Sequence, residues 1–521
     1  MPPLLQEIGG FRKRRADLRI ALVYPNSYRV GMANLGLHTV YSLFNSYPDV
    51  ACERCFLGMD RSIETNTPLS DFDVIAFSLQ YELDYPNVYR ILREAGIEVR
   101  RDRRASPMVI AGGPCCFNPI PMTDVVDLFA VGDVEPVADN LIRGLLLGES
   151  AVEIAQPEGL LSSESMDETQ VARAEDLDAI PAPINQPRPV SGMDHALGDT
   201  FMVEISRGCN VRCRFCMYSH CTFPKRERSF DRIREIVEEG IRVTGSSKVS
   251  LIGALVTDHS ELKGILGYLA DRGLSASLPS IRTDGVDEEV LELIGELGIR
   301  TLTIAPEGSP HIRSILKKGL QEDGIRYVGE SAHDHGVRKL RLYFMTGIPG
   351  EQESDLQYVT DLCSSFAKVY GPRGLTASVN PLIPKPHTPA ESIPMANPER
   401  IEANYAYLRR NMPRGMNLNL QSVRMSVIQA YLARGTRKTA AVLAQMGESS
   451  GYGVWKRAAA SSGDPITRAF CPPREMPWHV IKTGLPRDYL QRQSDRMLNL
   501  SGQGPALLKK GGDPPKKGEF S

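Results

Sequence analysis

Short apolar runs alternate with amphipathic helical patterns in two long stretches of this chain, and this alternation restricts the possible folds more than any other feature. Four runs in the first stretch have the length and composition of buried strands. They are residues 20–24, 74–79, 108–111 and 128–131. Because strands that alternate with helices pair in parallel, we expect a doubly wound α/β sheet over residues 1–150.

Glycines follow two of these four runs. Gly112 and Gly113 come after the third run, and Gly132 comes after the fourth. Ligands of open α/β sheets bind at the carboxyl ends of the strands. Glycine allows a backbone to approach a large ligand closely, but it serves tight strand-to-helix turns equally well. The three glycines are therefore either candidate ligand contacts or turn residues.

The alternation stops in a Ser-, Glu- and Pro-rich segment and then resumes. Residues 151–198 have the composition of an extended linker. Six strand candidates follow, with helical patterns between them. They are residues 201–205, 248–252, 275–278, 301–304, 340–344 and 375–379. Six βα units indicate a partial (β/α)6 barrel over residues 199–395, with an active site at the carboxyl ends of its strands.

The remaining sequence has a different character. Residues 396–500 are mainly helical in pattern, with long candidates at 398–411 and 423–443. Residues 501–521 are rich in Gly, Pro and Lys, so we expect a disordered tail there.

Three closely spaced cysteines directly follow the first strand candidate of the barrel. Cys209, Cys213 and Cys216 form a C-x3-C-x2-C motif. Thiolates are soft ligands of iron–sulfur clusters, and a cubane normally takes four of them. Three protein ligands would leave one iron open to a small molecule. A structural zinc site is the alternative, with His220 or Cys221 as the fourth ligand.

The bulk properties exclude several classes. A formal net charge of −2 gives no general electrostatic reason to bind nucleic acid or an anionic membrane. The first twenty residues contain no apolar core of a secretion signal, and no apolar run has the ~18 residues of a membrane span. Ten cysteines in a chain of this length do not indicate a disulfide framework. We therefore expect a cytoplasmic protein without a membrane segment.

The cysteine motif at this position in a (β/α)6 barrel resembles the radical S-adenosylmethionine (SAM) superfamily. Phe215 matches the aromatic residue that the family often has before its third cysteine. The resemblance implies that Cys209, Cys213 and Cys216 hold a [4Fe–4S] cluster. It also implies that the open iron is chelated by the amino and carboxylate groups of SAM, and that one-electron reduction of SAM gives a 5′-deoxyadenosyl radical.

Further motifs resemble the SAM-binding parts of that family in barrel order. Ser280 and Arg282 follow the third strand candidate, where they are suitably placed for the SAM carboxylate. Glu307 closes the fourth strand, where the family places a polar residue against SAM. Gly347, Gly350 and Glu351 follow the fifth strand in a turn similar to the adenine-contacting turn. The family's Gly-Gly-Glu after the second strand is here Gly-Ala-Leu, from residue 253.

The first domain resembles the cobalamin (B12)-binding, Rossmann-like domain of some superfamily members, within a two-domain subgroup. The resemblance implies that Gly112, Gly113 and Gly132 contact cobalamin. The Asp-x-His-x-x-Gly motif, whose histidine ligates cobalt in many cobalamin proteins, is absent. The alternative is a degenerate domain that has lost the cofactor and still covers one side of the barrel.

Four other cysteines raise the question of a second cluster, as in methylthiotransferases. Those proteins place single cysteines at three strand ends, whereas here the first of these loops, residues 25–31, contains none. Cys52 and Cys55, and the adjacent Cys115 and Cys116, are therefore interpreted as buried, redox-inert thiols.

The leading hypothesis is a radical SAM enzyme that generates an adenosyl radical and abstracts hydrogen from an unactivated carbon; if cobalamin binds, the expected outcome is methyl transfer to that carbon. Two alternatives are a cobalamin-independent rearrangement, oxidation or sulfur insertion, and a non-catalytic iron–sulfur protein for electron transfer or assembly. The family implies an electron donor such as flavodoxin or ferredoxin. The sequence does not indicate a nucleic-acid partner, a particular substrate or a catalytic residue beyond the cofactor ligands.

Overall fold

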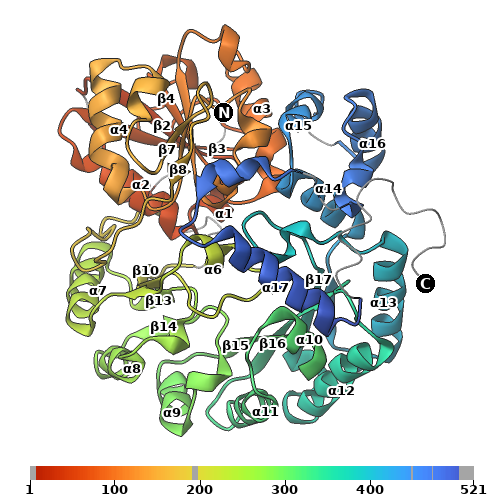
Figure 1. The fold of residues 1–521 in the computed structure, drawn as a ribbon. Coiled ribbons are helices and arrows are strands. Elements are labelled where there is room, and N and C mark those ends of the chain that lie inside the picture. Colours follow the sequence, from red (N-terminus) through yellow and green to blue (C-terminus); the bar gives the residue numbers. More distant parts are fainter. Residues whose placement is uncertain are drawn as a thin grey trace.

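The computed structural model describes residues 7–13, 15–190, 198–447, 450–471, 473 and 475–503. A sheet-based unit formed by the first part of the chain lies against a larger unit whose strands and helices follow an arc (Figure 1). The last helices of the chain lie beside and across the larger unit. The expected α/β architecture, with a doubly wound sheet, a partial barrel and a helical C-terminal region, is confirmed.

Six strands form the sheet of the first unit, in the order β3-β2-β4-β5-β6-β7. All neighbours pair in parallel except β6 and β7. The strands are β2 (Leu18–Tyr24), β3 (Val50–Phe56), β4 (Val74–Ser78), β5 (Met108–Gly112), β6 (Leu128–Ala130) and β7 (Leu160–Ser162).

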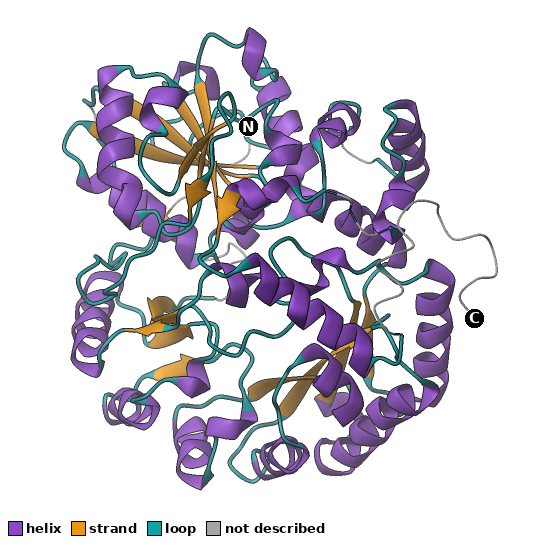
Figure 2. Ribbon diagram, in the orientation of Figure 1, coloured by secondary structure: helices purple, strands orange, loops and turns teal. Residues whose placement is uncertain are grey.

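Helices cover both faces of this sheet, as a doubly wound topology requires (Figure 2). Ile20 and Leu22 of β2 pack in an apolar cluster with α2 (Leu35–Ser46) and α4 (Glu135–Leu147). Ala21 and Val23 point to the opposite face, which packs with α3 (Tyr85–Glu94). Because successive side chains of a strand alternate between faces, both sets are buried and the strand is apolar throughout.

Two strands of this sheet were not predicted. Strand β3 contains Glu53 and Arg54 and therefore has no apolar run, but both are buried. The Arg54 Nε lies 2.7 Å from Glu64 Oε1, so the buried charge is paired. Strand β7 and the short helix α5 (Ala151–Ile154) lie in the segment predicted to be a linker. The first sheet thus continues past residue 150.

The second unit is an arc of seven parallel strands. Hydrogen bonds join β10-β13-β14 and β15-β16-β17-β18, and a parallel bridge between Ile281 and Ile304 connects the two groups. The strands are β10 (Phe201–Glu204), β13 (Lys248–Ile252), β14 (Ser275–Ser277), β15 (Thr301–Glu307), β16 (Lys339–Thr346), β17 (Leu375–Pro381) and β18 (Asn417–Leu420). The first six are the predicted barrel strands. Strand β18 extends the arc with an alternating Asn-Leu sequence.

Helices follow most of these strands and form the outer layer of the arc (Figure 1). They are α7 (Phe230–Thr244), α8 (Leu262–Asp271), α9 (Glu288–Glu296), α10 (Pro310–Leu316), α11 (Glu322–Ser331), α12 (Glu353–Tyr370) and α13 (Pro398–Asn411). Each strand therefore presents its carboxyl end on one side of the barrel, where the strand-to-helix loops meet.

The region after α13 is helical, but the predicted helix over residues 423–443 is interrupted. It forms α14 (Val423–Ala433) and α15 (Arg437–Leu443), separated at Gly435. A Cβ at Gly435 would lie 2.4 Å from Pro121 of the first unit, so the chain turns where the two units touch. Two more helices follow, α16 (Tyr452–Ser461) and α17 (Arg487–Leu500).

Helix α17 crosses the mouth of the barrel (Figure 1). Its buried Met497 and Leu498 pack with Ile312 of α10, Ile348 after β16 and Leu382 after β17. The helix thus covers part of the rim formed by the carboxyl ends of the strands.

Two pairs of short strands join segments that are far apart in the sequence. Strand β8 (Thr169–Gln170) pairs with β19 (Ile481–Lys482), and β1 (Glu7–Ile8) pairs with β9 (Arg188–Pro189). Much of the predicted linker is therefore held against other parts of the chain. The predicted tail lies outside the described residues from residue 504 onward. In the described part of the chain, no helix combines the length and the apolar character that crossing a membrane requires.

Candidate functional site

The three motif cysteines lie in the loop after β10, at the mouth of the barrel. Cys209 and Cys213 are 6% and 8% exposed, and Cys216 is half-buried at the start of α6 (Met217–Cys221). Gly208 opens the loop with a φ of +85°, and a Cβ there would lie 2.4 Å from the Pro224 carbonyl oxygen. Only glycine fits this turn, which brings the chain out of the strand and into the cysteine loop.

Burial disfavours the charged form of two of the three motif thiols. Burial raises the pKa of Cys209 above its usual value and raises the pKa of Cys213 to about 12. A thiolate in such surroundings needs compensating positive charge. A bound metal supplies that charge and deprotonates the thiol directly.

Lys318, a half-buried lysine that no sequence motif marks, lies beside the thiols. The Lys318 Nζ is 2.7 Å from Glu307 Oε1. Burial disfavours the ammonium form, yet the charges of Glu307, Cys213 and Cys216 hold the pKa of Lys318 above its usual value. The lysine therefore keeps a positive charge at the cysteine loop. No motif marks it, because it follows α10, whereas Glu307 closes β15.

Glu307 is held in an unusual backbone conformation. Its φ is +66°, and the pairing of β15 with β16 shifts register between Ile304 and Glu307. A residue with a side chain in this region of φ is strained, and such strain persists where the surrounding structure imposes it. The irregular strand end presents the Glu307 carboxylate to Lys318, as the ion pair shows.

The predicted SAM-carboxylate residues lie next to this ion pair. The Arg282 guanidinium donates to the carbonyl oxygens of Lys318 and Gly319, at 3.0 and 3.3 Å, and also pairs with Asp284. Arg282 therefore holds the segment that carries Lys318. Ser280 is half-buried immediately before the bridge that joins the two halves of the barrel. Direct contacts of Ser280 or Arg282 with SAM stay predictions.

The predicted adenine turn is built around a buried carboxylate. Glu351 accepts hydrogen bonds from the Gly347 N–H at 2.7 Å, the Thr346 hydroxyl at 3.1 Å and the Asn404 amide at 2.9 Å. Burial raises the pKa of Glu351 to about 7.

A cavity of about 440 Å³ adjoins this turn. Gly347, Gly350 and Glu351 line it together with residues that include Asn397 and Phe470. Glu351 thus fixes the backbone shape of the turn, and the turn forms one wall of a cavity.

A second cavity, of about 460 Å³, lies between the two units. Its floor enters the first unit between the sheet and helices α2 and α4. Small residues form much of that floor, namely Ala33, Gly36, Ala76, Gly112 and Ala130. Its opposite wall comes from the barrel and includes Glu204, Arg207 and Tyr218, close to the cysteine motif in sequence. The cavity therefore connects the carboxyl edge of the first sheet with the start of the cysteine loop.

The three predicted glycines all line this cavity, but for different reasons. Gly113 and Gly132 have φ values of +103° and +107°, and a Cβ at either would lie under 3 Å from a backbone atom. Both are therefore required by tight turns. The nearest atom to a Cβ at Gly112 would be the Ala130 carbonyl oxygen, at 3.7 Å. Gly112 thus leaves space in the cavity that a side chain could occupy.

A buried ion network joins the two units beside this cavity. Arg207 lies 3.1 Å from Asp133 Oδ1, 3.0 Å from Glu135 Oε1 and 2.8 Å from Glu204 Oε2. Arg226 also reaches Asp133, at 2.7 Å. Asp133 and Glu135 belong to the first unit, whereas Arg207 stands two residues before Cys209. The network therefore fixes the start of the cysteine loop relative to the first sheet.

The other cysteines do not add to the loop. Cys52 and Cys55 lie on β3 but in different apolar clusters, and Cys115 and Cys116 are buried near α3. Burial raises the pKa of all four thiols. This agrees with buried, inert thiols.

The described residues do not support the alternative of a structural zinc site. No three His, Cys, Asp or Glu side chains among them are gathered closely enough to hold a single metal ion. The His220 Nδ1 is instead hydrogen-bonded to the Cys216 carbonyl oxygen at 2.9 Å. A cubane takes each thiolate on a different iron, so its ligands need not converge on one point.

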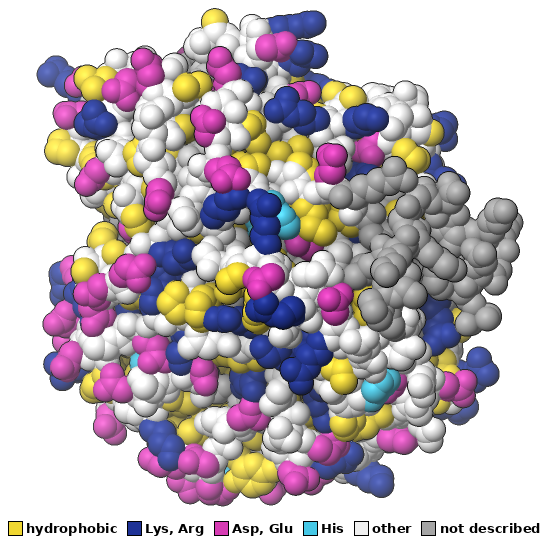
Figure 3. Space-filling view, in the orientation of Figure 1, with side chains coloured by type: hydrophobic (Ala, Val, Ile, Leu, Met, Phe, Trp, Pro, Cys, Tyr) yellow, Lys and Arg dark blue, Asp and Glu magenta, His cyan; other side chains and the backbone are white. Residues whose placement is uncertain are grey.

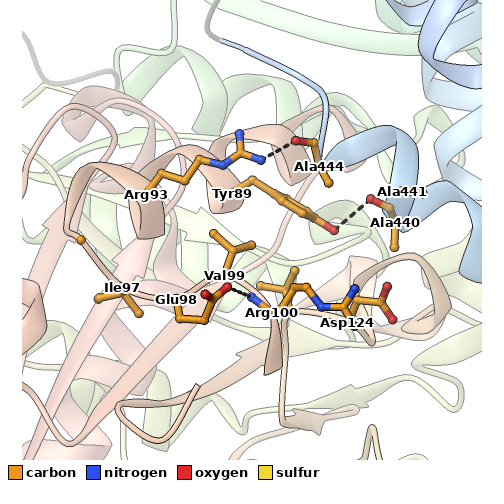
Figure 4. Close-up of a pocket in the computed structure, with 12 residues that line it drawn as sticks. Tyr89, Arg93, Ile97, Glu98, Val99, Arg100, Asp124, Ala440, Ala441 and Ala444 are labelled. Carbon is orange, nitrogen blue, oxygen red and sulfur yellow. Dashed lines mark hydrogen bonds between the residues drawn. The ribbon is translucent and has the colours of Figure 1, made fainter. Parts of the chain in front are cut away.

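A further open cavity of about 630 Å³ lies away from the cysteines, between α3 and α15 (Figure 4). The Arg93 guanidinium donates to the Ala444 carbonyl oxygen, and the Tyr89 hydroxyl donates to that of Ala440 at 3.5 Å. Arg100 pairs with Asp102 at 2.6 Å. The hydrogen bonds of Arg93 and Tyr89 attach α15 to the first unit, so we interpret this cavity as a groove of the contact between the two units.

The fold and the site together define a two-domain α/β protein with an iron–sulfur type of ligand loop at a barrel mouth. The family model described as "Radical SAM proteins, N-terminal" matches residues 36–162, and that of the "Radical SAM superfamily" matches residues 203–363. An uncharacterized protein of Methanocaldococcus jannaschii, MJ0966, is 31% identical over 422 residues, 80% of this chain and 88% of that protein. The chain belongs to the radical SAM superfamily.

Two other proteins extend the comparison. The tRNA-2-methylthio-N(6)-dimethylallyladenosine synthase of Francisella philomiragia is 23% identical over 390 residues, 67% of this chain and 76% of that protein. The radical SAM methyltransferase TsrM from Kitasatospora setae, solved with cobalamin and a [4Fe–4S] cluster bound, is 13% identical with a TM-score of 0.52. The match covers 87% of this chain and 99% of TsrM, and it shows a shared fold.

Superfamily membership implies a [4Fe–4S] cluster and SAM as cofactors. The donor set fits this pair, because three thiols on one loop would leave one iron of a cubane without a protein ligand. The half-buried cation of Lys318 lies where it offsets the negative charge of the thiolates.

Proposed function

We propose that this protein cleaves SAM reductively and uses the resulting 5′-deoxyadenosyl radical, together with cobalamin, to methylate an unactivated carbon. Cys209, Cys213 and Cys216 would ligate three irons of the cluster and leave the fourth to the amino and carboxylate groups of SAM. The cofactors supply the radical and the methyl group, and the protein orients them and excludes water.

The charged groups beside the cysteine loop would orient SAM. Lys318 is a half-buried cation that interacts electrostatically with Cys213 and Cys216, so it is suited to bind the SAM carboxylate. Arg282 holds the Lys318 backbone in place through two hydrogen bonds to carbonyl oxygens. Glu307 keeps the Lys318 side chain ionised and directed. Ser280, at the adjoining strand end, completes the polar rim in this proposal.

The turn after β16 would receive the adenine. Glu351 takes three hydrogen bonds from groups around the turn and so fixes its shape. Gly347 and Gly350 have φ values of +71° and +79°, which leaves backbone without side chains on the wall of the adjoining cavity. Gly347 is buried, and a Cβ at Gly350 would lie 2.5 Å from the Ser501 carbonyl oxygen, so both glycines let neighbouring segments pack closely around the turn.

The observation that carries the cobalamin part is the 460 Å³ cavity between the two units. It begins at the carboxyl edge of a doubly wound sheet, where such folds bind ligands. It continues into an apolar space floored by small residues, which suits a flat group such as the nucleotide base of a corrinoid. Its volume is that of a small-molecule site and smaller than an intact corrinoid, so the macrocycle would lie at the domain boundary.

Methylthiolation is the second candidate, because a relative with that activity matches two thirds of the chain. In such enzymes a second cluster supplies sulfur. The four cysteines of the first unit are buried among apolar side chains, and two of them face opposite sides of the sheet. This arrangement favours methyl transfer over sulfur insertion.

The test begins with anaerobic reconstitution of the cluster, followed by SAM and dithionite and mass spectrometry of the products. We expect 5′-deoxyadenosine, and S-adenosylhomocysteine when cobalamin is present. A reconstituted cluster that yields neither product, and whose EPR spectrum ignores SAM, would support the electron-transfer alternative instead.

The cobalamin assignment has its own variant. Gly112→Leu should fill the cavity, and the protein should then fail to retain hydroxocobalamin after desalting while keeping its cluster absorption. Gly267→Leu is the matched control, because Gly267 lies on α8 with open space around its Cα. Equal corrinoid retention by wild type and Gly112→Leu would contradict binding in this cavity. No retention by the wild type would assign the first unit to the degenerate class.

A further inference from the structure

Helix α17 covers part of the cysteine loop on the face shown in Figure 1. The Arg214 Nε donates to Gln493 Oε1 of α17 at 3.2 Å, and the Arg212 guanidinium lies 5.5 Å from the Tyr489 ring centroid. Phe215 packs against the cluster formed by Met497 and Leu498. Three residues of the cysteine motif, Arg212, Arg214 and Phe215, thus contact the inner side of α17.

The outer side of α17 is basic. Arg492 and Arg496 are exposed along α17, Arg487 is exposed at its first turn, and Lys317 is exposed at the end of the adjacent α10. We call these four residues the α17 basic face. Dark blue side chains gather over this helix in the middle of the space-filling view (Figure 3). The only carboxylate ion pair that the described residues show for this set joins Arg492 to Asp488.

A buried arginine strengthens the positive charge from below. Arg214 donates to the carbonyl oxygens of Ser314 and Ile315, at 3.0 and 2.7 Å, and these are neutral acceptors. None of the groups that accept these hydrogen bonds carries a negative charge, so the Arg214 guanidinium adds positive charge beneath the α17 basic face.

We propose that the α17 basic face is the docking surface for an acidic one-electron carrier protein that reduces the cluster. The proposal rests on the proposed function, because only a redox-active cluster needs such a partner. One electron passes from carrier to cluster, so the carrier is oxidised and the cluster is reduced, and no bond is formed or broken. A carrier seated on α17 would be separated from the cysteine loop by about one helix diameter, ~10–12 Å.

The same surface suits nucleic acid less well. Asp488 and Asp495 lie on α17 among the arginines, where they would repel a phosphate backbone but could pair with basic residues of a folded protein. Met497 and Leu498 are fully buried, so α17 is packed down and presents a closed surface above the loop. A surface on which positive and negative side chains alternate can orient a partner protein, as in complexes between electron-transfer proteins.

The experiment compares two reductants on the reconstituted full-length protein. Reduced flavodoxin is an acidic carrier that must dock, whereas dithionite is a small ion that need not. Stopped-flow absorbance near ~400 nm follows the cluster. We expect Arg492→Glu/Arg496→Glu to lower the second-order rate with flavodoxin at least about ten-fold and to remove most of its dependence on salt. The rate with dithionite should stay within about two-fold of wild type.

The matched control is Lys456→Glu/Arg457→Glu, which reverses two exposed charges on α16. It should leave both rates unchanged. If the α17 variant reacts with flavodoxin at the wild-type rate, the proposal is wrong. If it also loses affinity for bulk tRNA in a gel-shift assay, the surface is a nucleic-acid face. Failure of the proposed function appears differently, as a wild-type cluster that dithionite reduces without forming 5′-deoxyadenosine from SAM.

Discussion

The two carboxyl edges of parallel strands in this protein are built from opposite kinds of residue. The barrel edge carries thiols, the Lys318–Glu307 ion pair and the buried carboxylate of Glu351, held in position by hydrogen bonds. The edge of the first sheet carries glycines and alanines, and it leaves a cavity of about 460 Å³. The βα unit therefore supplies polar and thiol groups at its carboxyl end in the barrel, and space for a ligand at its carboxyl end in the first sheet.

The difference also sets what each edge needs from its neighbours. The barrel edge has its own ligands and cations, whereas the cavity of the first sheet is completed by Glu204, Arg207 and Tyr218 from the barrel. If this comparison is correct, a substitution at the cysteine loop should leave the cavity of the first sheet intact. A substitution in the ion network between the two units should affect both the cysteine loop and the cavity.

The largest effect is expected at the cysteine loop. Cys213→Ala should abolish the absorption near ~400 nm of the reconstituted cluster, because a buried ligand is lost that no nearby donor replaces. Retention of hydroxocobalamin should not change. Cys363→Ala, at a buried cysteine of α12, is the control and should keep the cluster. Parallel loss of both cofactors in Cys213→Ala would contradict the independence of the two edges.

The next largest effect is expected at the ion network of Arg207, which lies between the two units. Arg207→Met leaves the carboxylates of Asp133, Glu135 and Glu204 buried with less positive charge, which typically costs about 3–5 kcal/mol. Urea unfolding should show this loss, together with weaker retention of both cofactors. Arg234→Met, at an exposed pair with Asp231, should change stability by less than about 1 kcal/mol. A wild-type unfolding curve for Arg207→Met would show that the network does not join the units.

A smaller effect, dependent on pH, is expected at Glu351. Its pKa is about 7 in the folded protein and lower when unfolded, so the native state binds the extra proton between these values. The stabilising contribution of Glu351 is therefore complete below the unfolded pKa and is lost as pH rises through 7. Relative to Glu351→Gln, wild-type stability should fall by up to ~3 kcal/mol from pH 5 to pH 8. A difference that is constant with pH would refute the raised pKa.

The smallest effect sharpens the assignment of SAM contacts. Lys318→Met should weaken SAM binding about ten-fold, or ~1.4 kcal/mol, because a half-buried cation near the thiols is lost. The measurement is the SAM concentration that half-converts the EPR signal of the reduced cluster. Lys317→Met changes the neighbouring exposed lysine and should bind SAM normally. Normal affinity in Lys318→Met would transfer the role to Arg282.

Sequence patterns predicted those parts of the molecule in which chemistry or periodicity is local. The cysteine spacing, the barrel strands and the glycine turns are contained in short segments. Strand β3 was missed because the charges of Glu53 and Arg54 interrupt its apolar pattern, and their partners lie elsewhere in the chain. Strand β18 was missed because its asparagines and its half-buried leucines lack the signal of a buried strand.

The candidate site shows the same division. Lys318 and Arg207 occupy no recognisable motif, and each depends on residues brought together by the fold, such as Glu307 in one case and Asp133 in the other. Arg282 was selected for its position after β14, but the backbone carbonyl oxygens it binds could not be foreseen from a pattern. Three-dimensional proximity decides which charges act together.

The position of α17 has a consequence for how the protein is made. The cysteine loop leaves the ribosome long before the helix that covers it, and chains generally begin to fold from the amino terminus during synthesis. The nascent barrel therefore has a period in which its thiols are accessible to the machinery that delivers iron and sulfur. Docking of Met497 and Leu498 against α10 would end that period, so we expect α17, the last helix among the described residues, to close over the loop after the cluster is inserted.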